Sequence, residues 1–129
     1  MTAAELRTIY LGYLDCLNAQ DWSRLGEFVH ETATHNGRPF GLAGYRSMLE
    51  SDFRQIPDLH FHAELLVCEP PVIAARLRFH CSPKGEFLGL PLNGRTVSFA
   101  ENVFYEFDGG KIRQVWSVLD KTAIEEQLV

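Results

Sequence analysis

The sequence contains little cysteine and no long apolar run. Its three cysteines, Cys16, Cys68 and Cys81, are far apart and form no C-x-x-C pair, so the sequence indicates neither a disulfide framework nor a zinc site. No apolar stretch approaches the length needed to span a bilayer, and the first residues lack the basic and apolar regions of a secretory signal. We therefore expect a cytoplasmic protein without a membrane segment.

Basic residues are also few. The 12 Lys and Arg stand against 17 Asp and Glu, and nowhere do they gather into a patch that could neutralise successive phosphates. The sequence has no P-loop, dinucleotide fingerprint, G-x-S-x-G or H-E-x-x-H motif. His60 and His62 have the spacing of two metal ligands, but no third ligand follows at a suitable distance. These absences argue against a nucleic-acid partner and against a metal site.

Aromatic residues, in contrast, are plentiful. The chain has 129 residues, which is enough for one domain (1–129) with its own core, and 12% of them are aromatic, nine being Phe. A small domain can use so much ring surface either to fill a core or to wall a pocket. Composition alone leaves both uses open.

Helical periodicity marks the first part of the chain. Thr2 and Glu5 form a capping-box pattern, and apolar residues then recur at helical spacing as far as Leu17. Asp21 is expected to cap a short second helix over residues 22–29. A third helix is expected over residues 45–56, because Pro57 ends the pattern. Residues 30–41 are expected to form a loop.

The second part of the chain alternates apolar and polar residues, as strands do. The four expected strands cover residues 59–68, 72–81, 96–107 and 111–120, and residues 123–128 are expected to form a closing helical turn. Three helices followed by antiparallel strands predict an α+β fold in which a curved sheet wraps around the helices. Such a sheet forms a conical barrel with an open end, which is the natural place for a pocket in a small domain.

Asp120 is the carboxylate best placed for chemistry in this pattern. It ends the last expected strand on the same face as Trp116, beside an apolar surface. Burial disfavours the charged form of a carboxylate and so brings its pKa toward the range useful for proton transfer. The alternative is that Asp120 only caps the helical turn that follows it.

The residues that face Asp120 depend on the register of the last hairpin. A two-residue turn at Gly109-Gly110 places Phe99, Val103 and Tyr105 on the Asp120 face. A three-residue turn with a bulge brings Ser98, Asn102, Phe104 and Glu106 there instead. Asn102 and Phe104 belong to the site only in the second case, and the sequence leaves both registers open.

Other side chains could complete a pocket. His35 and Asn36 precede Gly37 in the expected loop, where an imidazole could relay a proton and an amide could hold a carbonyl or enolate oxygen. The hydroxyl of Tyr13 needs a partner, which is either structural or a substrate oxygen. The aromatic residues divide into expected core and expected pocket wall: Phe28, Phe61 and Phe79 in the core, and Tyr13, Phe53 and Trp116, with either Phe99 and Tyr105 or Phe104, in the wall.

Several short motifs also occur in a fixed order along the chain. They are Asn18-Ala19-Gln20-Asp21, Thr34-His35-Asn36, Ile56-Pro57-Asp58-Leu59, Gly85 to Pro91, and Gly110-Lys111-Ile112 through Trp116 to Asp120. Their order and spacing resemble N-A-x-D, V-x-H-N, F-P-D-L, G-E-F-x-G-I-P and G-K-I-x-x-x-W-x-x-x-D of the SnoaL-like polyketide cyclases and ester cyclases. This family belongs to the nuclear transport factor 2 superfamily, and the resemblance covers most of the chain.

The resemblance implies a function as well as a fold. In these cyclases an Asp at the position of Asp120 is the general acid and base of an intramolecular aldol closure, with no cofactor or metal. It implies that His35, Asn36 and Asn102 steady the enolate of a small apolar carbonyl substrate. It also implies a homodimer, and because Val115 and Leu119 oppose the Asp120 side, we expect that apolar outer face of the sheet to be buried between two subunits.

One departure from the family pattern keeps other functions open. Cys81-Ser82-Pro83 stands where the family has G-T-H, so a polar His beside the pocket mouth is missing. A binding domain for a small apolar ligand, or an isomerase or hydrolase of the same superfamily, therefore stays an alternative to a cyclase.

Overall fold

A computed structural model describes residues 1–129 and begins with helix α1 (Ala3–Asn18). The expected capping box is present: the Glu5 backbone N–H donates to the Thr2 hydroxyl (3.1 Å), and the Thr2 N–H donates to the Glu5 carboxylate (3.0 Å). The buried stripe of α1 packs against the sheet and consists of Leu6, Tyr10, Tyr13, Leu14, Cys16 and Leu17.

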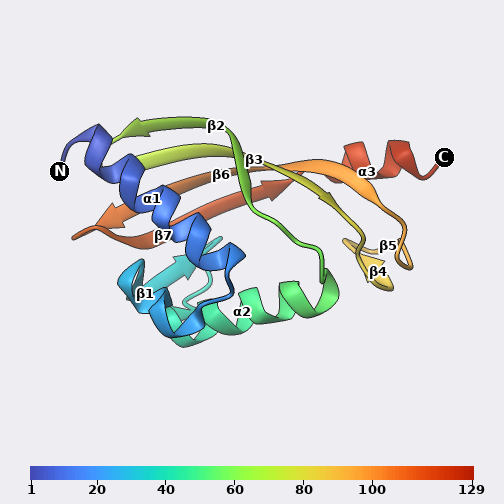
Figure 1. Cartoon of the computed structure of the whole chain (residues 1–129), viewed down its shortest axis with the longest axis horizontal. Coiled ribbons are helices and arrows are strands. Elements are labelled where there is room, and N and C mark those ends of the chain that lie inside the picture. Colours follow the sequence, from blue (N-terminus) through green and yellow to red (C-terminus); the bar gives the residue numbers. More distant parts are fainter.

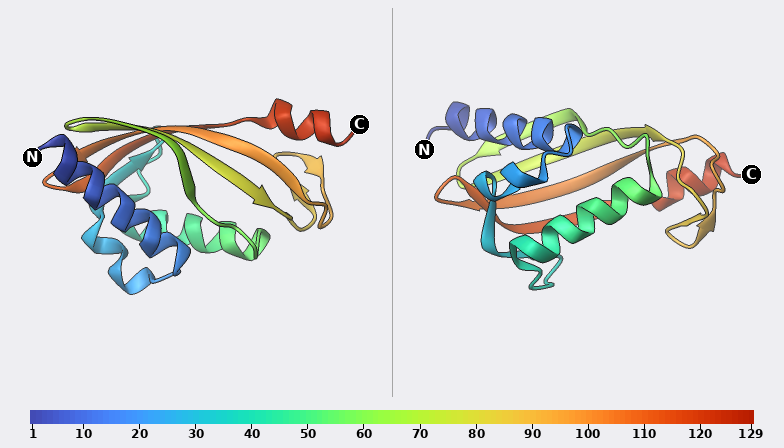
Figure 2. Two further views of the ribbon diagram at one scale, coloured as in Figure 1. Left: turned by 45° about the horizontal axis from the view of Figure 1, so that its top comes forward. Right: turned by 60° about the horizontal axis from the view of Figure 1, so that its bottom comes forward.

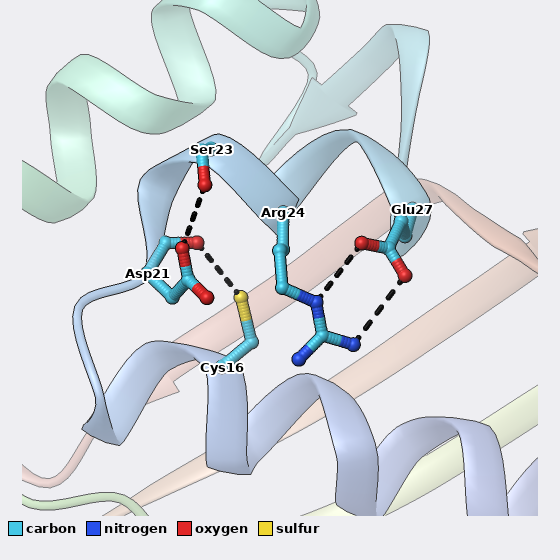
Figure 3. Close-up of polar contacts among 5 residues, drawn as sticks. All are labelled: Cys16, Asp21, Ser23, Arg24 and Glu27. Atoms are coloured by element: carbon cyan, nitrogen blue, oxygen red, sulfur yellow. Dashed lines mark hydrogen bonds and ion pairs between the residues drawn. The ribbon is translucent and has the colours of Figure 1, made fainter.

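The second expected helix is a 3-10 helix, η1 (Trp22–Glu27). Figure 3 shows why Asp21 does not cap it in the expected way: its carboxylate accepts a hydrogen bond from the Ser23 hydroxyl (2.8 Å) and none from the helix backbone. The Asp21 backbone carbonyl accepts from the Cys16 thiol (3.3 Å), which ties η1 to the end of α1. The exposed Arg24–Glu27 pair (3.0 Å) completes the turn and contributes little to stability.

A strand, β1 (Val29–His35), replaces the last residue of the expected second helix and the first part of the expected loop, and it pairs in parallel with the last strand along the chain. Helix α2 (Gly41–Gln55) follows and ends before Pro57, as expected. It begins at a glycine for a physical reason, because Gly41 has a φ of 65° and a Cβ there would lie 2.9 Å from the Glu31 carbonyl oxygen.

The four expected strands are present as β2 (His62–Glu69), β3 (Val72–Cys81), β6 (Val97–Asp108) and β7 (Lys111–Leu119). With β1 they form one sheet of order β1-β7-β6-β3-β2, antiparallel except for the β1–β7 pair. A small hairpin, β4 (Glu86–Phe87) and β5 (Leu90–Pro91), lies between β3 and β6, and helix α3 (Lys121–Gln127) follows β7. The α+β fold is confirmed (Figure 1).

The layers leave one face of the sheet largely uncovered. Both views in Figure 2 show α1, η1 and α2 on one side of the curved sheet, with α3 beyond the end of β7. The core lies between these helices and the concave face of the sheet. We call the opposite face the outer face.

The β6–β7 hairpin follows neither register expected from the sequence. Its turn at Gly109-Gly110 has two residues and pairs Phe107 with Ile112, but Arg113 is then an extra residue, so that Glu106 pairs with Gln114. The bulge reverses the faces of β7 beyond it. Val115 is 2% exposed on the concave face, not on the outer face as expected.

Candidate functional site

A cavity of about 500 Å³ lies between α2 and the concave face of the sheet. Fourteen of its 20 lining residues are hydrophobic, including rings from α1, α2 and the strands. The six polar lining residues are His35, Asn36, Asp52, Glu101, Ser117 and Lys121. A cavity of this size and composition suits a small, mainly apolar molecule.

Asp52 places a carboxylate in the α2 wall of this cavity. It shares a helical stripe with Met48, Leu49 and Ile56, which line the same wall. Burial alone raises the pKa of Asp52 from 3.8 to about 6, with no contribution from a hydrogen bond or a neighbouring charge. Asp52 therefore changes its protonation state close to neutral pH.

Glu101 is a second carboxylate, on the sheet side of the cavity. It occupies a core-facing position of β6, between Phe99 and Val103. Burial raises its pKa, the hydrogen bond donated by the Ser117 hydroxyl lowers it, and the negative charge of Asp52 raises it. The two carboxylates are thus electrostatically coupled across one cavity.

Asn36 fixes the position of Ser117. Its side-chain oxygen accepts from the Ser117 backbone N–H (2.8 Å) and its amide nitrogen donates to the Ser117 carbonyl (3.2 Å). Asn36 has a φ of 49°, a left-handed conformation that asparagine tolerates better than most residues. Asn36, Ser117 and Glu101 therefore form a connected polar chain from the turn after β1 through β7 to β6.

His35 lies at the cavity next to aromatic rings. Its imidazole stacks on Phe40 (centroids 6.1 Å apart) and meets the ring of Tyr45 edge-on (6.2 Å). Burial first, and then the positive charge of Arg38, lower the pKa of His35. The imidazole is therefore mainly neutral at neutral pH.

Four tyrosines meet beside the cavity, and three of them, Tyr13, Tyr45 and Tyr105, line it. The hydroxyls of Tyr13 and Tyr45 are 2.6 Å apart, and the Tyr10 hydroxyl donates to that of Tyr105 (3.2 Å). Burial raises the pKa of all four side chains, so they stay protonated.

The structure places Asp120 differently from the expectation. Its carboxylate accepts from the Ala123 N–H (3.1 Å) and so caps α3, the role that the sequence offered as an alternative. Asp120 does not line the cavity, although its neighbours Leu119 and Lys121 do.

Three other expected site residues lie on the outer face: the Arg113 bulge turns Trp116 of β7 away from the cavity, whereas Asn102 and Phe104 of β6 alternate with the core-facing Val103 and Tyr105. Phe104 and Trp116 pair with each other there and are 53% and 44% exposed. Asn102 accepts a hydrogen bond from Arg76 (3.1 Å) on the same face. The expectation that these three side chains line the cavity is therefore wrong.

The aromatic wall also differs in part from the expectation. Phe53 is buried against Trp22 and Phe61 (centroids 5.8 and 6.1 Å away) and is not a lining residue. Phe61 and Phe79, expected in the core, do line the cavity. Tyr13, His35 and Asn36 lie along it, as expected.

Sequence reasoning missed Asp52 and Glu101, although both carry a signal. Glu101 interrupts the apolar alternation of positions 97–107 at a core-facing position. Asp52 interrupts the apolar stripe of α2. A charged residue at a core-facing position marks a functional candidate even before the structure is known.

The described residues offer no metal site and no membrane-spanning helix. No group of three His, Cys, Asp or Glu side chains is arranged to hold a metal ion. None of the helices is both long and apolar enough to cross a bilayer.

Comparison with known proteins agrees with this architecture. The model of the SnoaL-like polyketide cyclase family matches residues 7–128. The chain belongs to this family. A solved SnoaL-like polyketide cyclase from Agrobacterium tumefaciens is 58% identical over the whole of both chains, with a TM-score of 0.96.

More distant solved structures share the fold alone. AclR from Streptomyces galilaeus, described as a candidate hydroxylase, is 22% identical with a TM-score of 0.79, and covers 98% of this chain and 97% of its own. IdmH from Streptomyces antibioticus, described as a candidate polyketide cyclase, is 19% identical with a TM-score of 0.81, over 95% of this chain and 97% of its own. No protein of curated function matches the chain.

Proposed function

We propose that this SnoaL-like protein catalyses proton transfer next to a carbonyl group, in an aldol-type cyclisation of a small apolar carbonyl compound. The observation that carries the proposal is the carboxyl of Asp52, which lines an apolar cavity and has a pKa of about 6. A general base is most effective when its pKa lies near the working pH. The cyclase description of the family and of the Agrobacterium tumefaciens relative supports the choice of reaction.

In the proposed reaction, the Asp52 carboxylate removes a proton from the carbon beside the first carbonyl. The C–H electron pair becomes the C=C bond of an enolate and the C=O π pair moves to the oxygen, while the proton stays on Asp52. The enolate carbon then bonds to a second carbonyl carbon of the same molecule, and Asp52 returns its proton to the new alkoxide. The cavity contributes by holding the two carbonyl groups close together.

Two other polar residues have roles in this proposal. The neutral imidazole of His35 can donate a hydrogen bond to the second carbonyl. The negative charge of Asp52 raises the pKa of Glu101, which favours the protonated form of Glu101 beside the ionised base. Asn36 acts indirectly, since it holds the Ser117 that donates to Glu101.

The test uses β-tetralone, a bicyclic ketone whose α-protons exchange slowly enough to follow by proton NMR in heavy water. Wild-type protein should accelerate the exchange. Asp52→Asn keeps the size of the side chain and removes the base, so it should lower the catalysed rate by about a hundredfold or more.

Asp120→Asn is the matched variant, because the resemblance to the cyclases assigns the acid and base role to Asp120. Asn caps helices about as well as Asp, so α3 should be retained. We expect Asp120→Asn to keep the exchange activity. Loss of activity in Asp120→Asn with retention in Asp52→Asn would transfer the catalytic role to Asp120. Ketone binding without any catalysed exchange by the wild type would favour a binding domain.

We also propose that the protein is a homodimer through the outer face of the sheet. Five large apolar side chains lie exposed on this face: Leu65, Val67, Phe104, Trp116 and Val118. Phe104 of β6 pairs with Trp116 of β7 on one side and with Ala74 of β3 on the other. Ala74 in turn pairs with Val67 of β2, so that apolar side chains form a row across four strands. Exposed apolar patches of this kind are typical of interfaces between subunits.

A further inference from the structure

The paired hydroxyls of Tyr13 and Tyr45 form an unusual group in the cavity wall. Tyr13 comes from α1 and Tyr45 from α2, and each residue is only 2% exposed. Their oxygens are 2.6 Å apart, and both residues line the cavity that contains Asp52. Two helices thus bring two hydroxyls together in the wall of a mainly apolar cavity.

The number of O–H donors determines what this hydroxyl pair can bind. Each tyrosine hydroxyl has one O–H donor, so the pair has two protons, of which one lies between the two oxygens. Neither hydroxyl forms another hydrogen bond within the protein. One O–H donor is therefore left over on two buried side chains, and a buried donor without an acceptor is costly.

The protein around the two tyrosines keeps both hydroxyls protonated, so the free O–H donor can bind a ligand oxygen. Burial raises the pKa of both hydroxyls, and the negative charge of Glu101 raises it further. Both hydroxyls thus stay protonated at any pH at which the protein works. The burial of both tyrosines disfavours a fully ionised ligand oxygen at this point, so the group that fits best is a neutral carbonyl oxygen, which accepts a hydrogen bond and gains negative charge only during the reaction.

We propose that the Tyr13–Tyr45 hydroxyl pair binds the carbonyl oxygen of the substrate, so that the site accepts apolar ketones or esters by their oxygen. This inference rests on the proposed function for its role in catalysis, where the hydroxyl pair stabilises the enolate oxygen as Asp52 takes the proton. The ketone-binding part can be tested without any turnover.

The experiment compares fluorenone, a rigid aromatic ketone with no α-proton, with fluorene, which has the same rings and no carbonyl oxygen. The variant is the double substitution Tyr13→Phe with Tyr45→Phe. A single substitution leaves one hydroxyl whose proton can still reach the ligand, whereas the double variant removes both. Replacing both members of a buried hydrogen bond by apolar groups of the same shape is nearly neutral for stability. Tyr10→Phe is the matched control, because Tyr10 donates to Tyr105 and does not line the cavity.

We expect the double variant to bind fluorenone about threefold to tenfold more weakly than the wild type, the loss of one hydrogen bond, and to bind fluorene equally well. The infrared carbonyl band of bound fluorenone should lie at lower frequency in the wild type and in Tyr10→Phe than in the double variant. An equal loss of affinity for both ligands would overturn the proposal, since it would mean only a reshaped cavity. An unchanged affinity for fluorenone, or the same carbonyl frequency in all three proteins, would overturn it as well.

The two proposals can fail separately. Fluorenone has no α-proton, so its binding does not depend on Asp52 acting as a base. Loss of exchange activity in Asp52→Asn with no effect of the double variant on fluorenone would keep the proposed function and remove the carbonyl site. The opposite pattern would keep a ketone-binding site and remove the base.

Discussion

Replacing Asp52 by Asn should stabilise the protein at neutral pH. Ionised Asp52 is buried without a compensating partner, and this raises its pKa from 3.8 to about 6. Each pKa unit corresponds to about 1.4 kcal/mol, so ionisation of Asp52 costs the folded state up to about 3 kcal/mol. Because the side chain is partly exposed to the cavity, we expect about 2 kcal/mol in practice.

The pH dependence of this effect has a definite sign. In the unfolded chain Asp52 ionises around its ordinary pKa of 3.8, whereas in the folded protein it ionises only at about 6. The folded state therefore binds the proton more tightly, and the Asp52 contribution to the free energy of unfolding falls as the pH rises from about 4 to about 6. The advantage of Asp52→Asn over the wild type should be absent below this range and complete above it.

Urea unfolding followed by tryptophan fluorescence, at pH values on both sides of this range, measures the effect. Asp15→Asn is the control, because Asp15 is exposed on α1. The free energy of unfolding of Asp52→Asn should increasingly exceed that of the wild type from about pH 4 to about pH 6 and keep the full difference above that, and Asp15→Asn should show no such change. Equal stability of Asp52→Asn and wild type at every pH, or a less stable variant at neutral pH, would refute the reasoning on which the proposed base depends.

Three further predictions concern the surroundings of the cavity and the outer face. Glu101→Gln removes the carboxyl whose pKa the Asp52 charge raises. Because burial alone raises the pKa of Asp52, the acid limb of the exchange rate should stay near pH 6, as measured in a pH series. A limb displaced to lower pH would show that a Glu101 charge acts on Asp52. Asn36→Gly keeps the left-handed backbone and loses both side-chain hydrogen bonds with Ser117. The free energy of unfolding, measured by urea titration, should fall by about 1 kcal/mol. An unchanged free energy of unfolding would mean that these hydrogen bonds contribute nothing. Trp116→Glu puts a charge into the proposed interface, so the molecular mass measured by light scattering should fall from that of a dimer to that of a monomer. A monomeric wild type, or a variant that stays dimeric, would argue against this interface.

The sequence predicted those elements whose signals are local. The Thr2–Glu5 capping box marked the start of α1, and Pro57 marked the end of α2. The alternation of residues 72–81 gave β3 with its observed bounds. In each case, neighbouring residues in the chain determine the structure.

Elements that depend on distant pairing were predicted less well. Strand β1 has only two buried residues, Val29 and Ala33, so its alternation is weak, and its partner β7 is far away in the sequence. The single extra residue Arg113 decides which side of β7 faces the cavity, and no local pattern reveals it. This bulge accounts for the misplacement of Trp116, whereas Phe104 and Asn102 were expected to face the cavity together with it and lie on the outer face by the alternation of β6.

The site was predicted in outline and not in its chemistry. Tyr13, His35 and Asn36 were placed at the cavity from their positions in the chain and from the family motifs. The two cavity carboxylates were missed because the apolar alternation of the strands and helices pointed only to core residues. A charged residue at a core-facing position becomes buried, and burial shifts its pKa toward the range useful for catalysis. Asp52 and Glu101 are such charges.

The central claim is that Asp52 is the base of a proton-transfer reaction, and the pH profile of β-tetralone exchange tests it most directly. The account predicts that the wild-type rate rises with pH through an inflection near 6 and then levels off. It also predicts that Asp52→Asn removes this inflection along with most of the rate, whereas Asp120→Asn keeps both. A profile that Asp52→Asn leaves unchanged, or an inflection that disappears only in Asp120→Asn, would contradict the account.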